Sequence, residues 1–267
     1  MLLDKYNRKI EYLRLSIIDK CNLRCTYCRP PEGLDLTKQA GVLSYEEMTE
    51  FVSTAAEMGL HKVRITGGEP LVRRDVVELV RMLAGVAGID DLSMTTNGTL
   101  LAPVARQLKE AGLHRVNVSL DTVEREGFAA LTGRDLLHDV FSGIEAALEA
   151  GLWPVKLNCV VKRSPEEPAA LGVARYAAEK GLDVRYIREM NLDDGEFWQV
   201  IGGKGGLCSE CNRLRLTSQG RLLPCLFSDL SFDVRELGAK EAILKAVAAK
   251  PQCGHHSHNN EFVSVGG

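Results

Sequence analysis

The sequence has 267 residues, of which 45% are hydrophobic and 26% are charged, and its formal net charge is −3. A chain of this length can bury a sizeable core, either as one large α/β barrel or as two smaller domains. The slightly negative charge excludes a broad basic surface for nucleic acid or an anionic membrane, so we expect any anionic ligand to be small and held locally.

Thiols are numerous in a chain with no sign of secretion. No apolar segment approaches the roughly 18 residues of a membrane span, and the first 20 residues carry charges every few positions. We therefore predict a cytoplasmic protein that does not associate with a membrane. In a reducing compartment, clustered thiols are more often metal ligands than disulfides. The eight cysteines are Cys21, Cys25, Cys28, Cys159, Cys208, Cys211, Cys225 and Cys253.

Short apolar segments alternate with amphipathic helical segments from about residue 12 to residue 190. Strands are predicted over residues 12–18, 62–66, 91–98, 115–121, 154–161 and 183–190. Ser44 and Glu47 predict a capping box, and Gly59, Gly112, Gly151 and Gly181 each stand where a helix is expected to end. We predict an α/β fold with a partial (β/α)6 barrel, whose functional residues lie at the C-terminal ends of the strands. A flavodoxin-like sheet is the alternative.

Three cysteines, Cys21, Cys25 and Cys28, stand within eight residues after the first predicted barrel strand. Three thiolates on a four-iron cluster leave one iron open to an outside molecule. A structural zinc site would need a fourth ligand, and no histidine lies nearby in the sequence. The CxxxCxxC spacing, with Tyr27 before the last cysteine, resembles the signature of radical SAM enzymes. This resemblance implies that the open iron chelates S-adenosylmethionine, which is cleaved to a 5′-deoxyadenosyl radical.

Residues after later strands support this hypothesis. Gly67 and Gly68 allow close backbone approach, and Glu69 can accept a hydrogen bond from an ammonium group. Alone, this loop would be a tight turn, but it should face the same mouth as the cysteines, which favours a role in binding the methionine part of SAM. Ser119 and Met190 end later strands and are further candidates for SAM contacts, although either side chain could simply pack.

The pattern changes after Met190. Residues 191–206 are polar and glycine-rich, which predicts a linker, so we divide the chain into residues 1–190 and 191–267. The second part is predicted to form a β-hairpin turned at residues 218–220, a helix over residues 239–250 and a polar tail.

A second group of thiols, Cys208, Cys211 and Cys225, has the spacing CxxC-x13-C. Three grouped thiols predict a second four-iron cluster with an open iron. A redox dithiol is one alternative. A closed cluster or a zinc site is another, because Cys253 with His255 could supply a fourth ligand.

Two arginines, Arg213 and Arg215, follow this CxxC motif on a predicted strand. Because side chains alternate along a strand, both point to one face, where two guanidinium groups can bind phosphate oxygens beside the open iron. The tail residues Cys253, His255, His256 and His258 could bind a metal, but a solvated polar tail is the commoner structure.

These motifs together resemble the GTP 3′,8-cyclase (MoaA) family of radical SAM enzymes, which begins molybdenum cofactor biosynthesis. The resemblance runs from "RLSIIDKCNLRCTYCRP" through "VRITGGEPLVRRD", "TTNG", "VNVSLD", "VKLNCVV" and "CNRLRLTSQGRLLPCLFS" to Gly266 and Gly267. It implies a partial radical SAM barrel with a small C-terminal iron–sulfur-binding extension, two [4Fe–4S] clusters, and SAM. In this family the deoxyadenosyl radical takes the hydrogen from ribose C3′ of GTP, and the carbon radical attacks guanine C8 to give 3′,8-cyclo-7,8-dihydro-GTP.

The resemblance also implies roles for individual residues. Cys21, Cys25 and Cys28 would hold the SAM cluster, and Cys208, Cys211 and Cys225 the second cluster. Tyr27, Gly68, Ser119 and Met190 match SAM contacts. Arg14, Arg64, Thr95, Lys156, Arg213 and Arg215 match GTP contacts, and we group Arg213 and Arg215 with the SAM-cluster cysteines as catalytic. The diglycine end would insert toward the active site.

The resemblance also implies partner proteins, and this chain differs from the family in the length of one segment. The resemblance implies a reductant of the ferredoxin or flavodoxin type, a downstream cyclic pyranopterin monophosphate synthase, and a homodimer as one assembly to test. The family normally has several tens of residues between the last barrel strand and the second CxxC, whereas this chain has residues 191–207. Two other functions therefore stay open: a radical SAM enzyme acting on another substrate, such as a peptide, and a non-catalytic cluster or zinc protein.

Overall fold

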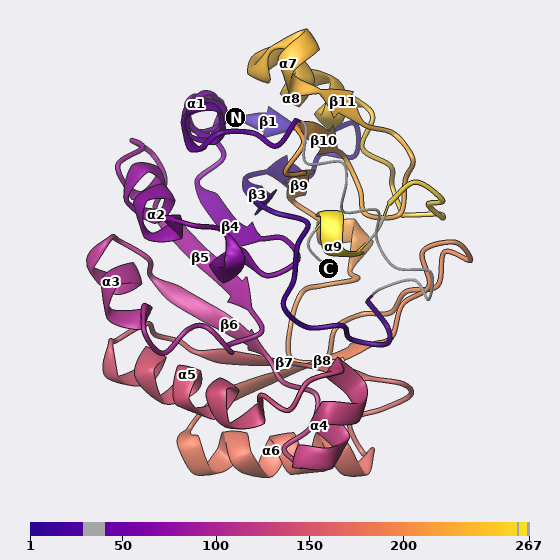
Figure 1. Cartoon of the computed structure of the whole chain (residues 1–267). Helices are drawn as coiled ribbons and strands as arrows, with labels where there is room; N and C mark the ends of the chain where they lie inside the picture. Colours follow the sequence, from indigo (N-terminus) through magenta and orange to yellow (C-terminus); the bar gives the residue numbers. More distant parts are fainter. Residues whose placement is uncertain (29–40, 261, 266–267) are drawn as a thin grey trace.

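One nine-stranded sheet organises residues 1–28, 41–260 and 262–265, which the computed structural model describes. Six neighbouring strands follow one another in chain order and pair in parallel. They are β3 (Tyr12–Ser16), β4 (Lys62–Thr66), β5 (Asp91–Thr96), β6 (Arg115–Ser119), β7 (Lys156–Val161) and β8 (Asp183–Arg188). The strand order never reverses, so the flavodoxin-like alternative is wrong. The predicted partial barrel is confirmed (Figure 1).

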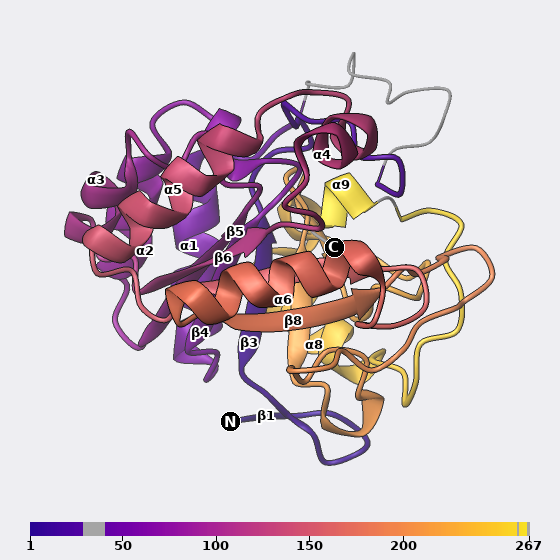
Figure 2. The ribbon, with the colours of Figure 1, turned by 90° about the horizontal axis from the view of Figure 1, so that it is seen from below.

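Helices cover the convex face of this curved sheet (Figures 1 and 2). They are α1 (Tyr45–Glu57), α2 (Val76–Ala84), α3 (Ala105–Glu110), α4 (Arg125–Thr132), α5 (Leu137–Glu149) and α6 (Pro168–Lys180), with a short 3-10 turn η1 (Pro70–Val72) after β4. The predicted capping box is present, because Ser44 Oγ accepts from the Glu47 amide at 3.1 Å and Glu47 Oε2 accepts from the Ser44 amide at 2.7 Å. The predicted exit glycines all have positive φ, from 65° at Gly181 to 107° at Gly59.

Successive side chains of a strand point to opposite faces of the sheet, so one face joins the apolar core and the other lines a polar barrel interior. In β3, Leu13 and Leu15 are completely buried in the core, whereas Tyr12 and Arg14 line a cavity on the other face. The same division repeats in β4, where Val63 and Ile65 join the core. A barrel whose strands are this regular can therefore present charged side chains inside without breaking its apolar shell.

The C-terminal part extends the same sheet beyond β3. β9 (Arg213–Leu216) pairs in parallel with β3, and β10 (Arg221–Leu223) and β11 (Phe232–Asp233) follow in antiparallel register. The predicted hairpin is confirmed, as is the predicted helix, which is α8 (Ala239–Ala248) and packs against α1 and β10. The remaining elements are β1 (Leu2–Leu3), β2 (Lys9–Ile10), η2 (Cys208–Glu210), α7 (Val234–Leu237) and α9 (Phe262–Val265). Strands from both sides of the predicted domain boundary at residue 190 therefore belong to one sheet.

Residues 191–206, predicted as a linker, form with Leu207 a folded segment that we call the strap (residues 191–207). Tyr186 of β8 and Ile201 exchange backbone hydrogen bonds of 3.0 and 3.1 Å, and the Val200 amide donates to Gly205 O at 2.8 Å. Gly206 has a φ of 77°, and a Cβ atom there would lie 2.1 Å from Trp198 O. The glycines therefore allow tight turns against β8 instead of making this segment a free spacer.

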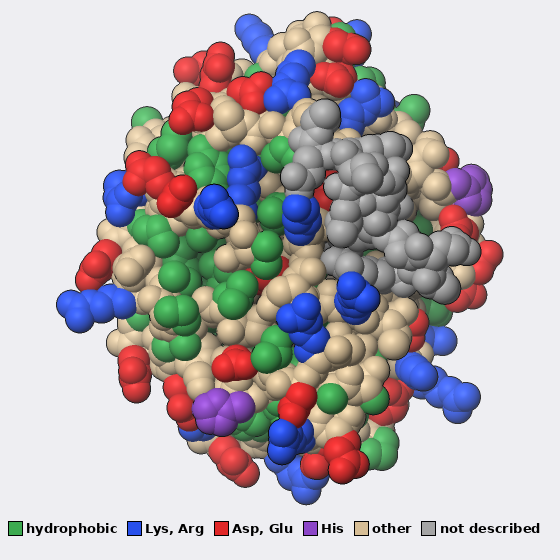
Figure 3. Space-filling model, in the orientation of Figure 1, with side chains coloured by type: hydrophobic (Ala, Val, Ile, Leu, Met, Phe, Trp, Pro, Cys, Tyr) green, Lys and Arg blue, Asp and Glu red, His purple; other side chains and the backbone are tan. Residues whose placement is uncertain are grey.

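Charged side chains of both signs are interspersed on the face shown in Figure 3. None of the helices in the described residues is long and apolar enough to span a membrane. The diglycine end, Gly266 and Gly267, lies outside the described residues.

The substitution Gly206→Ala tests whether the strap depends on its close backbone contacts. We expect it to lower the free energy of unfolding by about 1–3 kcal/mol more than Gly181→Ala does. Both glycines have positive φ, but a Cβ at Gly181 meets nothing within 4 Å. Urea unfolding of both variants measures the difference, and equal losses would show that the strap packs less tightly than described.

Candidate active site

The first three thiols stand on the loop after β3, at the C-terminal end of the barrel strands. The Cys28 amide donates to Cys25 O at 3.0 Å, which closes a turn around Tyr27. The Tyr27 hydroxyl donates to Asp121 Oδ2 at 2.7 Å, and Asp121 Oδ1 accepts from the Val160 amide at 2.7 Å. The cysteine loop is therefore fastened to the ends of β6 and β7.

The thiols of this loop suit a polynuclear cluster. Burial, together with the negative charges of Cys28 and Asp121, raises the pKa of Cys25 to about 12, so the metal-free thiol is protonated and would lose its proton on binding iron. Among the described residues, no three His, Cys, Asp or Glu side chains are close enough together to hold a single metal ion. Three thiols on one loop fit a four-iron cluster, which distributes its ligands over several metal atoms.

Gly67 and Gly68 hold the loop after β4 against the cysteine loop. The Gly68 amide donates to Ile18 O at 2.7 Å, and a Cβ at Gly68 would lie 2.4 Å from Lys20 O. A Cβ at Gly67 would lie 2.4 Å from Ile18 O. The two glycines were predicted to allow close approach of a backbone. The backbone that approaches them belongs to Ile18 and Lys20, which lead into Cys21.

Glu69 is completely buried and joins the loops after β4 and β5. Its carboxylate accepts from the Leu71 amide at 3.0 Å, the Thr96 hydroxyl at 2.7 Å and the Asn97 amide at 2.6 Å. Burial raises its pKa to about 7 despite these donors. The Asn97 side chain in turn lies 3.8 Å from Cys21 Sγ. Glu69 thus anchors the mouth of the site, and its direct contact with an ammonium group stays a prediction.

A cavity of about 570 Å³ occupies the barrel interior between the sheet and the strap. It brings together several predicted residues, namely Arg14, Arg64, Met190, Cys208, Cys211, Arg213, Arg215 and Cys225. Thr95, Ser119 and Lys156 do not line it, and the Lys156 ammonium pairs with Asp183 of β8 at 2.7 Å. The sequence therefore predicted four of the nine Lys and Arg side chains that line the cavity in the described part of the chain, and it also named a lysine that pairs with Asp183.

A row of arginines forms the cationic wall of this cavity. Arg14 lies in register between Arg64 on β4 and Arg215 on β9. Arg64 is 9% exposed and Arg215 is 5% exposed. Burial and the neighbouring guanidinium groups lower the pKa of Arg64 to about 10, although Tyr12 acts in the opposite direction. Because buried like charges are costly, an anion in the cavity would stabilise the row.

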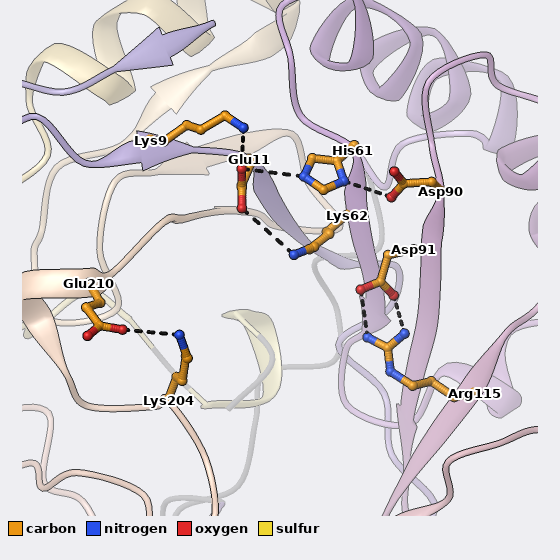
Figure 4. Close-up of polar contacts among 9 residues, drawn as sticks. All are labelled: Lys9, Glu11, His61, Lys62, Asp90, Asp91, Arg115, Lys204 and Glu210. Carbon is orange, nitrogen blue, oxygen red and sulfur yellow. Dashed lines mark hydrogen bonds and ion pairs between the residues drawn. The ribbon is translucent and has the colours of Figure 1, made fainter.

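Ion pairs neutralise charged side chains at the rim of this cavity. Lys62 lies 3.8 Å from Glu11, Arg115 pairs with Asp91, and Lys204 lies 3.3 Å from Glu210 (Figure 4). Within the described part of the chain, by contrast, Arg64, Arg185 and Arg213 form no salt bridge. The uncompensated positive charge is therefore inside the cavity.

Sequence reasoning missed several lining residues. Tyr12, Lys62 and Arg115 were detectable, because each shares its strand face with a predicted site residue, whereas Arg185 had no such signal. For Tyr12, burial raises the pKa, but the charges of Arg64, Arg14 and Arg213 lower it to about 8. Its phenol is therefore more acidic than usual and faces the same guanidinium groups.

The second set of thiols, on Cys208, Cys211 and Cys225, lines the same cavity. The Cys211 amide donates to Cys208 O at 3.1 Å across the η2 turn. Burial alone would raise the pKa of Cys211, but the ammonium of Lys250 and the guanidinium of Arg213 lower it to about 7. Lys250 is 1% exposed and donates to Arg213 O and Pro224 O, each at 2.7 Å. These fixed cations fit an anionic iron–sulfur cluster, and no sequence pattern indicated Lys250.

Comparison with known proteins gives one family. Residues 15–168 match the radical SAM superfamily. The GTP 3′,8-cyclase of Thermodesulfovibrio yellowstonii is 39% identical over 93% of this chain and 94% of its own length. That of Moorella thermoacetica is 38% identical over 96% and 95%. Both alignments, of 303 and 309 positions, are longer than this chain, so each relative has residues that are missing here, as the sequence predicts.

Two solved structures share the fold. Streptococcus suis SuiB bound to S-adenosylmethionine has a TM-score of 0.64 and 14% identity, over 94% of this chain and 66% of that one. The anSMEcpe structure with bound AdoMet has a TM-score of 0.65 and 18% identity, over 91% and 81%. At these identities the likeness shows the barrel architecture alone.

Removing the Lys250 charge tests the electrostatics of the second thiol set. In metal-free protein, we expect Lys250→Gln to raise the pKa of Cys211 above about 7, because the ammonium favours the thiolate. Iodoacetamide labelling of Cys211 at pH 7 should then slow, by about tenfold for each unit of pKa. Mass spectrometry of labelled peptides across a pH series gives the midpoint.

Lys245→Gln, on the exposed face of α8, is the matched control for that experiment and should leave the midpoint unchanged. Identical pH profiles for Lys250→Gln and the parent chain would contradict the assigned role of the ammonium.

Proposed function

We propose that this chain, which belongs to the GTP 3′,8-cyclase family of the radical SAM superfamily, converts GTP to 3′,8-cyclo-7,8-dihydro-GTP in molybdenum cofactor biosynthesis. The observation that carries the substrate class is the row of Arg215, Arg14 and Arg64, in which Arg64 and Arg215 are buried and Arg14 is half-buried; such a row suits a small polyanion such as a triphosphate. We assign the reaction to the lyase class, and its expected place is the first step of the pathway.

The first three cysteines would hold a [4Fe–4S] cluster whose open iron binds SAM. When bound, these groups supply a 5′-deoxyadenosyl radical. The chain's contribution is to hold the loop rigidly, through the Tyr27–Asp121 hydrogen bond and the backbone contacts of Gly67 and Gly68. These fixed contacts support positioning of the radical source over the barrel interior, with Tyr27, Gly68, Ser119 and Met190 as SAM contacts.

Polar atoms in the barrel interior support a bound ribose or SAM. Ser16 Oγ, Thr95 Oγ1 and both side-chain polar atoms of Asn117 are buried and have no hydrogen-bond partner in the described part of the chain. Thr95 and Asn117 are register neighbours on β5 and β6. Buried polar groups of this kind are uncommon and call for a partner, which a ligand's hydroxyl groups would provide. Thr95 therefore remains a proposed GTP contact, although it lies outside the cavity lining.

Cys208, Cys211 and Cys225 would hold a second [4Fe–4S] cluster beside the arginine row. Lys250 and Arg213 offset the negative charge of thiolates there, and Arg213 and Arg215 would hold the phosphates next to the cluster. A ferredoxin- or flavodoxin-type reductant and a cyclic pyranopterin monophosphate synthase downstream are the proposed partners. Homodimer formation stays a prediction.

The substitution Arg64→Gln tests phosphate binding by the row. We expect the Kd for GTP to rise about 10- to 100-fold, because charge-assisted hydrogen bonds contribute about 1.5–3 kcal/mol each. Guanosine, which has no phosphate, should bind both proteins alike in isothermal titration calorimetry. Arg106→Gln, on an exposed side chain of α3, is the matched control. Equal weakening for GTP and guanosine would place the phosphates elsewhere.

Product analysis tests the reaction itself. Anaerobically reconstituted protein with dithionite, SAM and GTP should yield 5′-deoxyadenosine together with a cyclised isomer of GTP, both measured by mass spectrometry. 5′-Deoxyadenosine with untouched GTP would keep the radical chemistry and exclude this substrate, which would favour the alternative of a peptide. Protein that cannot cleave SAM at all would match the non-catalytic alternative.

A further inference from the structure

Two aromatic side chains stand next to each other on the strap. Phe197 and Trp198 both line the main cavity. The Phe197 ring already packs against another ring of the protein, because its centroid lies 4.6 Å from that of Phe227. Trp198 is half-buried, and in the described part of the chain no other aromatic ring packs against it. The indole is therefore the aromatic surface of the strap that a ligand in the cavity can meet.

Arg188, at the end of β8, supports this indole. Its guanidinium carbon lies 3.7 Å from the centroid of the Trp198 ring, and a cation is attracted to the negative face of an aromatic ring. Trp198 lines the cavity, whereas Arg188 does not. The guanidinium group therefore covers the indole from a side that is turned away from the cavity.

Backbone contacts fix Trp198 near the second thiol set. A Cβ atom at Gly206 would lie 2.1 Å from Trp198 O, so the two arms of the strap are in direct contact. Gly206 stands two residues before Cys208, and two residues of chain span at most about 7 Å. Further along the strap, Ile201 pairs with Tyr186 of β8. Trp198 is thus held between the backbone of β8 and the start of the second thiol set.

The strap and the arginine row belong to different parts of the curved sheet. The row is carried by β9, β3 and β4, whereas the strap pairs with β8, the last strand at the other edge (Figure 1). Residues of both line the same cavity of about 570 Å³. A ligand that contacts both therefore needs a polyanionic end and a flat aromatic end, and a nucleoside triphosphate has this combination.

We propose that Trp198 is a specificity-determining residue that stacks on the guanine ring of GTP, and that Arg188 is the positioning residue that holds the indole. The inference rests on the proposed function and names the residue that recognises the base. Stacking uses the face of a purine, so the nitrogen and oxygen atoms at its edge stay free for the open iron of the predicted second cluster.

The position of Trp198 distinguishes the substrate base from the adenine of SAM. The proposed SAM cluster belongs to the cysteine loop after β3, whereas Trp198 contacts the segment that leads into Cys208. The base that meets the indole is therefore that of GTP.

The test measures dissociation constants on anaerobically reconstituted protein without a reductant, so that SAM is not cleaved. GTP, tripolyphosphate and SAM are titrated separately by isothermal titration calorimetry. The variants are Trp198→Leu, Trp198→Phe and Arg188→Gln. Trp153→Leu is the matched control, because the chain's other tryptophan is 52% exposed and does not line the cavity. Iron content and circular dichroism report whether each variant folds and holds its clusters.

We expect Trp198→Leu to raise the Kd for GTP about 5- to 100-fold, the range that loss of stacking on one base produces. The Kd values for tripolyphosphate and SAM should not change. Trp198→Phe, which keeps an aromatic face, should recover most of the affinity, and Trp153→Leu should behave like the parent chain.

Arg188→Gln separates a positioning role from direct phosphate binding. We expect it to raise the Kd for GTP by a smaller factor than Trp198→Leu does, because the indole loses its support but remains present. Tripolyphosphate should bind as tightly as before, although a positive charge has been removed. Weaker tripolyphosphate binding would instead make Arg188 a phosphate ligand and contradict its assigned role.

An unchanged Kd for GTP in Trp198→Leu would overturn the assignment. Equal weakening of GTP and tripolyphosphate would also overturn it, because the indole would then only shape the cavity, and so would weakening of SAM alone. If Trp198→Leu does not fold, the Kd values of Trp198→Phe and Arg188→Gln decide: affinity for GTP equal to that of the parent in both would reject stacking.

The product assay separates failure of this inference from failure of the proposed function. If the parent chain cyclises GTP while Trp198→Leu binds it normally, the function stands and the residue assignment is wrong. If the parent chain binds GTP through Trp198 but forms no cyclised product, the residue assignment stands and the proposed reaction is wrong.

Discussion

The buried arginine row is the constraint on which the rest of this site depends. Parallel pairing puts Arg14 beside Arg64 on one side and beside Arg215 on the other, at the same height in the barrel. Like charges that lie close together in a protein interior repel one another, so this row favours an anionic ligand in the cavity. The pairing of three strands thus sets the positive charge that the proposed ligand would meet.

The third arginine of the row is present because the C-terminal part joins the barrel sheet. β9 supplies Arg215 and at the same time carries the chain from Cys211 toward Cys225, so the arginine row and the second thiol set share one strand. The strap then closes the side of the cavity that β8 would leave open, with its glycines turned tightly against the backbone of Val184 and Trp198. A short segment thus covers this side of the cavity.

The sequence allowed prediction of features that depend on local rules. The strands followed from alternation, the Ser44 capping box from its spacing, and both thiol sets from their motifs. Lys250 and Asp121 escaped prediction because their roles arise from tertiary contacts between distant segments, which no local pattern records. The strap was misjudged for a physical reason: glycine-rich segments resemble linkers in composition, but glycine also permits the closest backbone packing. Lys156 shows what a strand position leaves open, because its ammonium pairs with Asp183 and its contact with GTP stays a prediction.

The most direct test of the central claim is the binding of inorganic tripolyphosphate to the protein without clusters, measured by isothermal titration calorimetry at several salt concentrations. If the arginine row is the phosphate site, tripolyphosphate binds with one site per chain, competes with GTP, and weakens as salt screens the guanidinium charges. Binding of GTP that tripolyphosphate does not compete with, and that salt does not weaken, would contradict this account.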